Sequence, residues 1–144
     1  MKPTPELVLN QTFARIAMEL GPALPPGYSQ GSATLTAVLL LMVAQEFNRA
    51  AAVRKAENDD MRRLFGDLAG KVAGELGRAL GEASRGSDAD LGVAALDKAN
   101  GALKTLLIEV HAWAETAGQR EIEHRILRHL QGWAAARQVI LPPM

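Results

Sequence analysis

Two side chains of opposite charge on one predicted helix are the strongest candidates for chemistry in this sequence. Glu46 and Arg49 stand three residues apart, just after the apolar run of residues 35–44. One turn of helix separates them, so they can pair, and a carboxylate removed from water needs such a partner. Three interpretations stay open: both heads lie in water at the end of a bundle, the pair is buried and fixes the packing, or it binds a ligand. The third makes Glu46, Arg49 and Tyr28 the candidate ligand-binding residues, with a loop over residues 24–28 closing the site.

A second pattern, Glu121 and His124, has the E-x-x-H spacing of di-iron helical bundles. Such a site needs a second E-x-x-H and two further glutamates, and the sequence offers neither. The helical wheel also places this pair opposite Ile126 and Leu130, on the side expected to face water. His111 and His129 are expected at helix margins as interfacial side chains. We therefore predict no metal site and no cofactor.

No catalytic residue can be assigned from the remaining motifs. The absence of Cys removes a thiol nucleophile and thiolate zinc sites, and it fits a reducing compartment such as the cytoplasm. No G-x-S-x-G elbow occurs, and the glycines that could suggest a phosphate loop follow helical spacing with no strand before them. These absences favour a non-enzymatic protein.

Charge gives the chain no general attraction to polyanions. The 16 basic and 16 acidic residues cancel, so we expect neither nucleic acid nor a membrane surface as a partner. The apolar run of residues 35–44 is also about half the length that spans a bilayer. The Ala, Leu, Gly and Arg content is typical of a GC-rich bacterium.

The same apolar run should organise the fold. On a wheel, Leu35, Leu39, Met42 and Val43 share one sector with Glu46 in its middle. A segment this apolar cannot show all its sides to water, so we predict a central helix over residues 33–53 that the other helices surround.

The next segment is unusual for its glycines, which recur at spacings of four, four, three and four beside an apolar arc. Each glycine costs about 0.5–1 kcal/mol relative to alanine inside a helix, so something should approach this stripe closely. A neighbouring helix, from the same chain or from a second copy, is the first interpretation, and a flat apolar ligand is the alternative. The predicted helix-packing or dimer face comprises Gly66, Gly70, Gly74, Gly77 and Gly81.

Periodicity predicts an all-α fold, an up-and-down helical bundle of four long helices plus a short N-terminal one, in a single domain over residues 1–144. The clearest helix has Leu103, Leu107 and Val110 on one face, and the last has Ile122, Ile126 and Trp133. The expected helices cover residues 5–20, 33–57, 59–84, 89–117 and 119–138. The proline-bearing stretch 21–32 is expected to be irregular, with Ser32 capping the central helix.

The boundary between the second and third helices has two interpretations. Arg54 and Lys55 followed by Glu57, Asn58, Asp59 and Asp60 resemble a basic last turn and an acidic first turn, which favours a break at residues 57–60. Against a break, no Gly or Pro lies between residues 54 and 65, and Val43, Phe47, Met61, Leu64 and Leu68 stay in phase. An unbroken helix over residues 33–83 would be roughly 75 Å long and would demand a dimer.

Two functional hypotheses follow. The first is a non-enzymatic interaction or scaffold protein that forms a homo-oligomer, most simply a dimer. Its contact would be the glycine stripe or the near-heptad repeat formed by the in-phase apolar residues between Val43 and Leu68. The second is a small-molecule-binding protein or enzyme with its site at the bundle end around Glu46 and Arg49.

Overall fold

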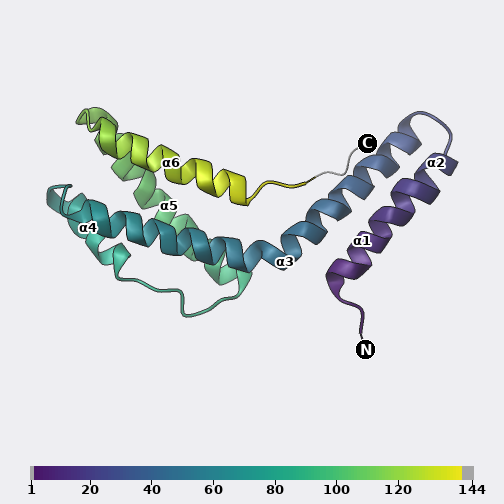
Figure 1. Cartoon of the computed structure of the whole chain (residues 1–144), viewed down its shortest axis with the longest axis horizontal. Coiled ribbons are helices and arrows are strands. Elements are labelled where there is room, and N and C mark those ends of the chain that lie inside the picture. The colour runs from purple at the N-terminus through teal and green to yellow at the C-terminus, as the bar shows by residue number, and fades with distance from the viewer. Residues whose placement is uncertain (1, 141–144) are drawn as a thin grey trace. The chain divides into compact units, whose positions relative to one another are not determined.

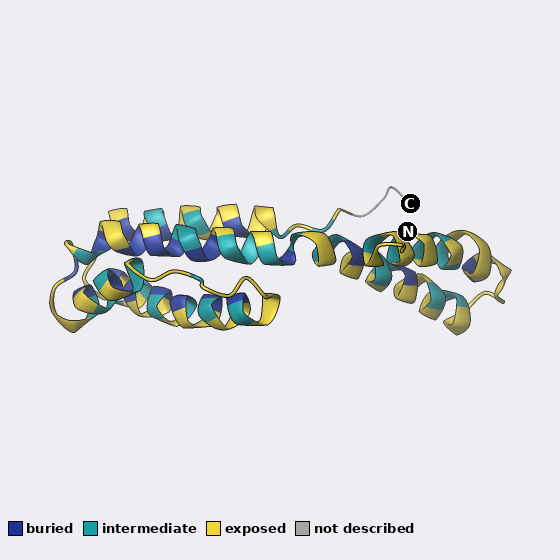
Figure 2. Cartoon of the chain, turned by 90° about the horizontal axis from the view of Figure 1, so that it is seen from below, coloured by how far each residue is buried: buried dark blue, intermediate teal, exposed yellow. Residues whose placement is uncertain are grey.

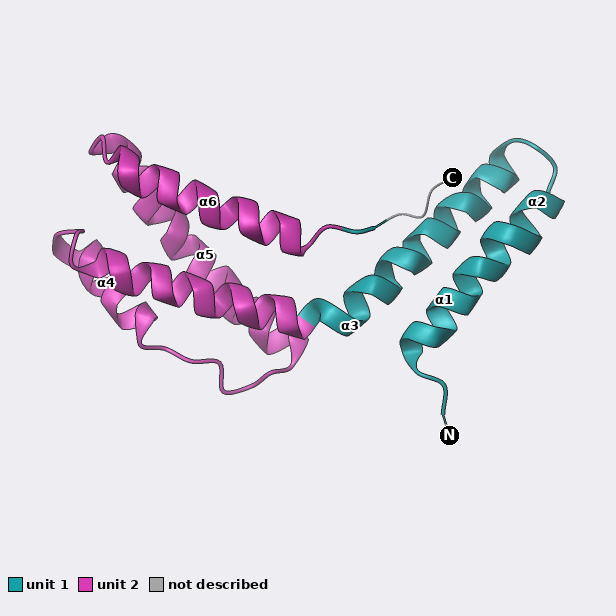
Figure 3. Ribbon diagram, in the orientation of Figure 1, with its two compact units in different colours: residues 1–50, 139–144 teal, residues 51–138 magenta. Residues whose placement is uncertain are grey.

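The computed structural model describes residues 2–140, and within that range every regular element is a helix (Figure 1). The all-α class predicted from the sequence is therefore confirmed. The described chain divides into two compact units (Figure 3): unit 1 contains residues 2–50 and 139–140, and unit 2 contains residues 51–138. The expectation of one domain over the whole chain stays a prediction. The elements are α1 (Pro5–Arg15), η1 (Ile16–Leu20), α2 (Gly21–Ala23), α3 (Tyr28–Ala69), α4 (Gly74–Ser84), α5 (Val93–Thr116) and α6 (Arg120–Ala136).

Unit 1 begins with a capped helix that widens before a proline. The hydroxyl of Thr4 accepts a hydrogen bond from the Leu7 amide at 3.3 Å and so caps α1. The π-helical turn η1 follows, and Pro22 comes directly after it. Proline has no N–H to donate and crowds the carbonyl four residues earlier, which a wider turn relieves.

The segment α1–η1–α2 lies against α3 as the first arm of a helical hairpin. Near the turn, a Cβ added at Gly21 would lie 4.0 Å from the Cβ of Ala33, and at the far end Asn48 donates a hydrogen bond to Glu6. The two contacts are fifteen residues apart on both arms (6 to 21 and 33 to 48), so the arms stay in register. The small side chains of Ala37 and Ala44 on α3 are each only 1% exposed.

The prediction of an irregular stretch over residues 21–32 is wrong. Only residues 24–27 lie outside helices, and α3 begins at Tyr28, so Ser32 is inside the helix and does not cap it. Gly27 has φ +122° and allows the chain to reverse within this short turn. The turn accommodates Pro25 and Pro26, which leaves the following residues free to be helical.

The prediction that other helices surround the apolar run of α3 is also wrong. Four of its large side chains, Leu35, Leu39, Met42 and Val43, are between 39% and 60% exposed, whereas Val38, Leu40 and Leu41 are half-buried. The N-terminal half of α3 is mostly coloured as exposed or half-buried in Figure 2. The hairpin supplies one neighbouring arm, and the backbone of Ile140 exchanges two hydrogen bonds with Gln45, at 2.7 and 3.0 Å. Neither neighbour covers these side chains. We call the uncovered residues the apolar face of α3, which consists of Leu35, Leu39, Met42, Val43 and Phe47.

Unit 2 holds the main hydrophobic core. The C-terminal part of α3 contributes Phe65 and Leu68, which are fully buried, and α4, α5 and α6 pack around them. The predicted faces of the last two helices are confirmed at Leu103, Leu107, Val110, Ile122, Ile126 and Trp133. Gly118, with φ +65°, ends α5 as expected for a glycine that follows a helix.

The predicted break at residues 57–60 is wrong, because α3 continues without interruption to Ala69. The polar side chains at these positions do not cap a new helix. Glu57 and Asp60 bind partners on α5 and α6, and Asn58 binds Asn100 on α5 and Asp88 in the loop before α5. The chain turns instead at residues 70–73, so the predicted helix over residues 59–84 is two helices. The helix expected over residues 89–117 begins only at Val93, so Asp88 lies in a longer loop before α5.

The glycines predicted to form one stripe are divided by this turn. Gly66 on α3 faces Ser84, where an added Cβ would lie 3.5 Å from the serine Cβ, and Gly81 on α4 faces Ala69 at 3.7 Å. These two glycines therefore serve the close approach of α3 and α4 within one chain. Gly77 serves the turn, because its Cβ would lie 1.8 Å from the Val72 carbonyl oxygen. Gly70 lies in the turn itself, and Gly74 begins α4 with φ +77°.

Candidate functional site

The pair Glu46 and Arg49 lies on α3 in unit 1, and both side chains are half-buried. Tyr28 is the first residue of the same helix and is 92% exposed. It precedes Glu46 by eighteen residues, which is roughly 27 Å along the helix axis. The structure therefore does not bring Tyr28, or the short turn before it, to the charged pair. Ligand binding at Glu46 and Arg49 stays a prediction.

The most elaborate arrangement of polar side chains lies in unit 2, at the level of residues 57–60 of α3. Glu57, Asn58 and Asn100 are each less than 5% exposed. Buried polar groups are costly unless they are hydrogen-bonded, so their partners decide what the cluster does. We call this cluster the polar layer, which consists of Glu57, Asn58, Asp60, Arg62, Asp88, Asn100, His129 and Arg137.

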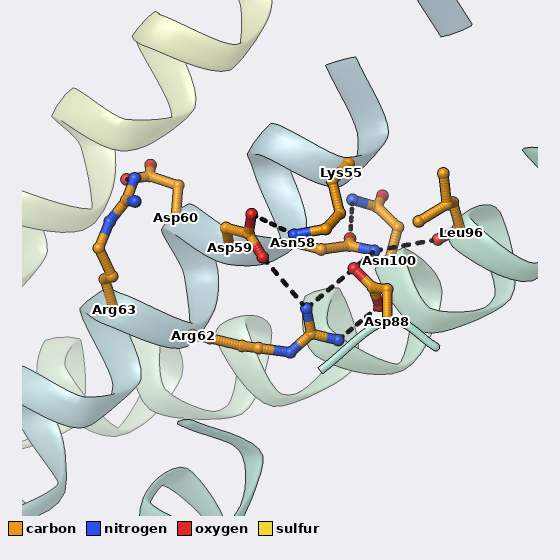
Figure 4. A network of polar contacts seen from close by, with 9 residues as sticks. All are labelled: Lys55, Asn58, Asp59, Asp60, Arg62, Arg63, Asp88, Leu96 and Asn100. Atoms are coloured by element: carbon orange, nitrogen blue, oxygen red, sulfur yellow. Dashed lines mark hydrogen bonds and ion pairs between the residues drawn. The ribbon is translucent and has the colours of Figure 1, made fainter. Parts of the chain in front are cut away.

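The first contact of the polar layer joins the loop before α5 to α3 (Figure 4). The guanidinium of Arg62 donates two hydrogen bonds to the Asp88 carboxylate, at 2.9 and 2.6 Å. The Asn58 amide donates to the same carboxylate at 3.2 Å and to the Leu96 carbonyl at 3.3 Å. The hydrogen bonds from Arg62 hold the pKa of Asp88 below its ordinary value, although burial opposes them. The loop is thus fastened by a paired, ionised carboxylate.

A second contact joins α3 to α5 and to the end of α6 through Glu57. Asn100 on α5 donates to Glu57 at 3.1 Å and to Asn58 at 2.9 Å, and Arg137 donates to Glu57 at 2.7 Å. The ammonium of Lys104 lies 3.5 Å from the same carboxylate. Burial alone would raise the pKa of Glu57, but the hydrogen bond and the charge of Arg137 outweigh it, so the pKa is lowered.

A third contact joins α3 to α6 through Asp60. The indole N–H of Trp133 donates to Asp60 at 2.8 Å, and Nδ1 of His129 lies 2.6 Å from the same oxygen. Burial would raise the pKa of Asp60, but the hydrogen bonds from His129, Arg63 and Trp133 lower it. The prediction of Trp133 as a core residue is confirmed. The hydrogen bond from its indole N–H to Asp60 is a contact that the sequence did not reveal.

Within residues 2–140 the structure holds no group of three or more side chains of the kinds that bind metal ions. The carboxylates of the polar layer are instead engaged with Arg, Asn, His and Trp donors from the surrounding elements. Chemically, the layer is a set of charge-assisted hydrogen bonds that fastens the loop before α5, α5 and α6 to α3. The sequence did not reveal the polar layer, because residues 57–60 resemble a helix start. The feature that could have indicated it is a run of charged residues in a segment that contains no Gly or Pro.

These pKa shifts predict how stability depends on pH. Glu57, Asp60 and Asp88 all have lowered pKa values in the folded chain. Each stabilises the fold above its unfolded pKa of about 4, and that contribution is lost as the pH falls through the folded value. We expect the free energy of unfolding, measured by urea denaturation, to be level near neutrality and to fall below about pH 4.5. Replacing Asp60 by Asn should make the acid loss shallower, and a stability that rises with acidification would contradict this assignment.

Unit 2 also has a shallow groove of about 230 Å³ between α5 and α6. Its walls are apolar, with Leu107 and Ile108 from α5 and Ile126 and Leu130 from α6. Lys104 and His111 line it as well, so the groove is apolar but has the Lys104 ammonium in its lining.

The apolar face of α3 in unit 1 is the second candidate for function. By length and composition, α3 is the one helix of the described residues that could cross a membrane, and 17% of its most apolar window is buried. The central helices of many soluble proteins meet the same criterion. Comparison of the sequence and structure with protein-family models, curated proteins and solved structures found no match.

Proposed function

We propose that this chain is a non-enzymatic, self-associating helical protein in which a second copy covers the apolar face of α3. The observation that supports the proposal is the exposure of that face, where five large apolar side chains lie within about four helical turns. Monomeric soluble proteins rarely leave a contiguous apolar surface of this kind uncovered. The polar layer of unit 2 fits a structural role, since its side chains bind one another across helices.

The energetics favour a reversible dimer. Burying the exposed half of each side chain is worth roughly 1 kcal/mol, so the faces of two copies together supply about 10 kcal/mol. Association costs about 4–15 kcal/mol in lost freedom of motion. Gain and cost are of similar size, so we expect association that depends on protein concentration and not a permanent dimer.

Charge favours a second copy over an anionic membrane. Helices that lie on such membranes carry Lys and Arg beside their apolar face, whereas α3 has no basic residue before Arg49. Residues 28–45 of α3 carry no charge at all, so two copies can approach there without repulsion between like charges. The groove between α5 and α6 is a less suitable contact for this face, because Lys104 and His111 line it.

Replacing Leu35 by Glu tests the proposal. Leu35 is 60% exposed, so the change should leave the fold intact while placing a carboxylate in the contact. We expect sedimentation equilibrium to show a concentration-dependent dimer for the wild-type chain and a dimer weakened about tenfold or more for Leu35→Glu. Leu91→Glu is the matched control, because Leu91 is also 60% exposed but lies in the loop before α5.

Three outcomes would contradict the proposal. The wild-type chain could be monomeric at every concentration, or both variants could weaken the dimer equally. The wild-type chain could also stay monomeric in solution and sediment with vesicles of phosphatidylcholine and phosphatidylglycerol, with Leu35→Glu abolishing that binding. The last result would identify a lipid surface as the partner of the apolar face.

A further inference from the structure

We infer that the two copies pair antiparallel, with the apolar face of one α3 against the same face of the other about a two-fold axis near residue 41. This inference rests on the proposed self-association and specifies its geometry. The axis position follows from the face itself, since residue 41 is midway between Leu35 and Phe47, the first and last residues of the face.

A parallel pairing is disfavoured by the position of Glu46. This residue follows Leu39 by seven positions and Met42 by four, so helical periodicity places it on the same side of α3 as the apolar face. In a parallel dimer the two Glu46 carboxylates would meet at the same level of the contact. Like charges brought together in an interface weaken it and suppress that arrangement.

The antiparallel pairing removes this conflict. With the axis near residue 41, Glu46 of one copy lies level with Thr36 of the other, in the uncharged part of the helix. Leu35 then lies level with Phe47 of the second copy, and Leu39 with Val43. Antiparallel helices also place opposite ends of their macrodipoles together, which is favourable.

The hairpin of unit 1 leaves this side of α3 available. Ala37 and Ala44, two small residues of α3 that are each 1% exposed, lie on nearly the opposite side of α3 from the apolar face. Two hairpins joined through their α3 helices therefore make a four-helix arrangement. Because each copy uses the same patch, the contact closes at a dimer and does not extend into a filament.

Disulfide crosslinking distinguishes the two geometries, because the chain has no Cys of its own. A disulfide requires Cα atoms about 4.4–6.8 Å apart. In the antiparallel dimer the two copies of residue 42 are offset by roughly 3 Å along the axis, and the two copies of residue 35 by roughly 18 Å. We expect Met42→Cys to form a covalent dimer under mild oxidation and Leu35→Cys not to.

A mixing experiment completes the design. Leu35→Cys and Phe47→Cys, one of them carrying a tag that changes its mass, should form a mixed covalent dimer on non-reducing gels. Leu91→Cys, placed in an exposed loop, measures crosslinking by random collision. Leu35→Cys that links to itself as readily as Met42→Cys would overturn the antiparallel geometry and leave self-association standing. Both proposals would be overturned if Met42→Cys, and the mixture of Leu35→Cys with Phe47→Cys, crosslinked no more than Leu91→Cys.

Discussion

Replacing Arg62 by Met is expected to lower the free energy of unfolding by about 3–5 kcal/mol, because it leaves the Asp88 carboxylate buried without its main partner. The side chains of Arg62 and Asp88 are 10% and 2% exposed, and two hydrogen bonds join them. Urea denaturation followed by tryptophan fluorescence measures this loss, since Trp113 and Trp133 both belong to unit 2.

The neighbouring arginine provides the control. Arg63 also pairs with an aspartate one turn away, at 3.0 Å from Asp60, but its side chain is 72% exposed. Exposed pairs contribute about 0–1 kcal/mol, so Arg63→Met should lose no more than that. Adding Asp88→Met to Arg62→Met should recover part of the loss, because no unpaired charge then remains buried. Equal losses for the two single arginine variants would show that the polar layer does not stabilise unit 2.

The second large effect is expected for Gly77→Ala at the start of α4. The new Cβ would lie 1.8 Å from the Val72 carbonyl oxygen, and backbone on both sides would have to move. Overpacking of this kind costs about 1–3 kcal/mol and more when backbone must shift, so we expect about 3 kcal/mol. Thermal and urea denaturation of the same protein measure it.

Gly101→Ala is the matched variant. Gly101 lies inside α5, and a Cβ added there would meet nothing within 4 Å. Alanine should stabilise the helix by about 0.5–1 kcal/mol, since it loses less conformational freedom on folding. A Gly77→Ala protein as stable as the wild type would show that the turn at residues 70–73 can rearrange at little cost.

The parts of the fold that the sequence predicted are those determined by local periodicity. The faces of α5 and α6 were correct because Leu103, Leu107 and Val110, and then Ile122, Ile126 and Trp133, recur at helical spacing and all reach one core. The all-α class followed from the same signal. The predicted start of this helix at residue 89 was wrong, since the chain before Val93 is held by Asp90 and Asp88.

The break in α3 was mispredicted because the same residues satisfy two different patterns. Asn58 and Asp60 are good capping residues for a helix start, and they are equally good partners for distant side chains. Their actual partners, Asn100, His129 and Trp133, are 42 to 73 positions away in the sequence, so no local rule includes them. Tertiary contacts here outweighed a local preference.

The error about the apolar run has another cause. Hydropathy shows that Leu35, Leu39 and Val43 need a cover but does not say what provides it. The prediction of a central helix requires the same chain to supply the cover, whereas these side chains are about half exposed. The candidate pair at Glu46 and Arg49 was placed on this helix correctly, but its proposed third member, Tyr28, is at the far end of unit 1.

The polar layer also restricts the rotation of α3 about its own helix axis within unit 2. Successive residues of a helix point about 100° apart, so the four side chains at positions 57–60 radiate around its whole circumference. Glu57 and Asn58 are held from α5, Asp60 is held from α6, and Asp59 lies 3.7 Å from Arg62 of α3 itself. An aliphatic stripe tolerates a small twist, because neighbouring methyl groups are nearly equivalent. Directional hydrogen bonds from other helices on three sides of α3, at Glu57, Asn58 and Asp60, permit one angular setting only.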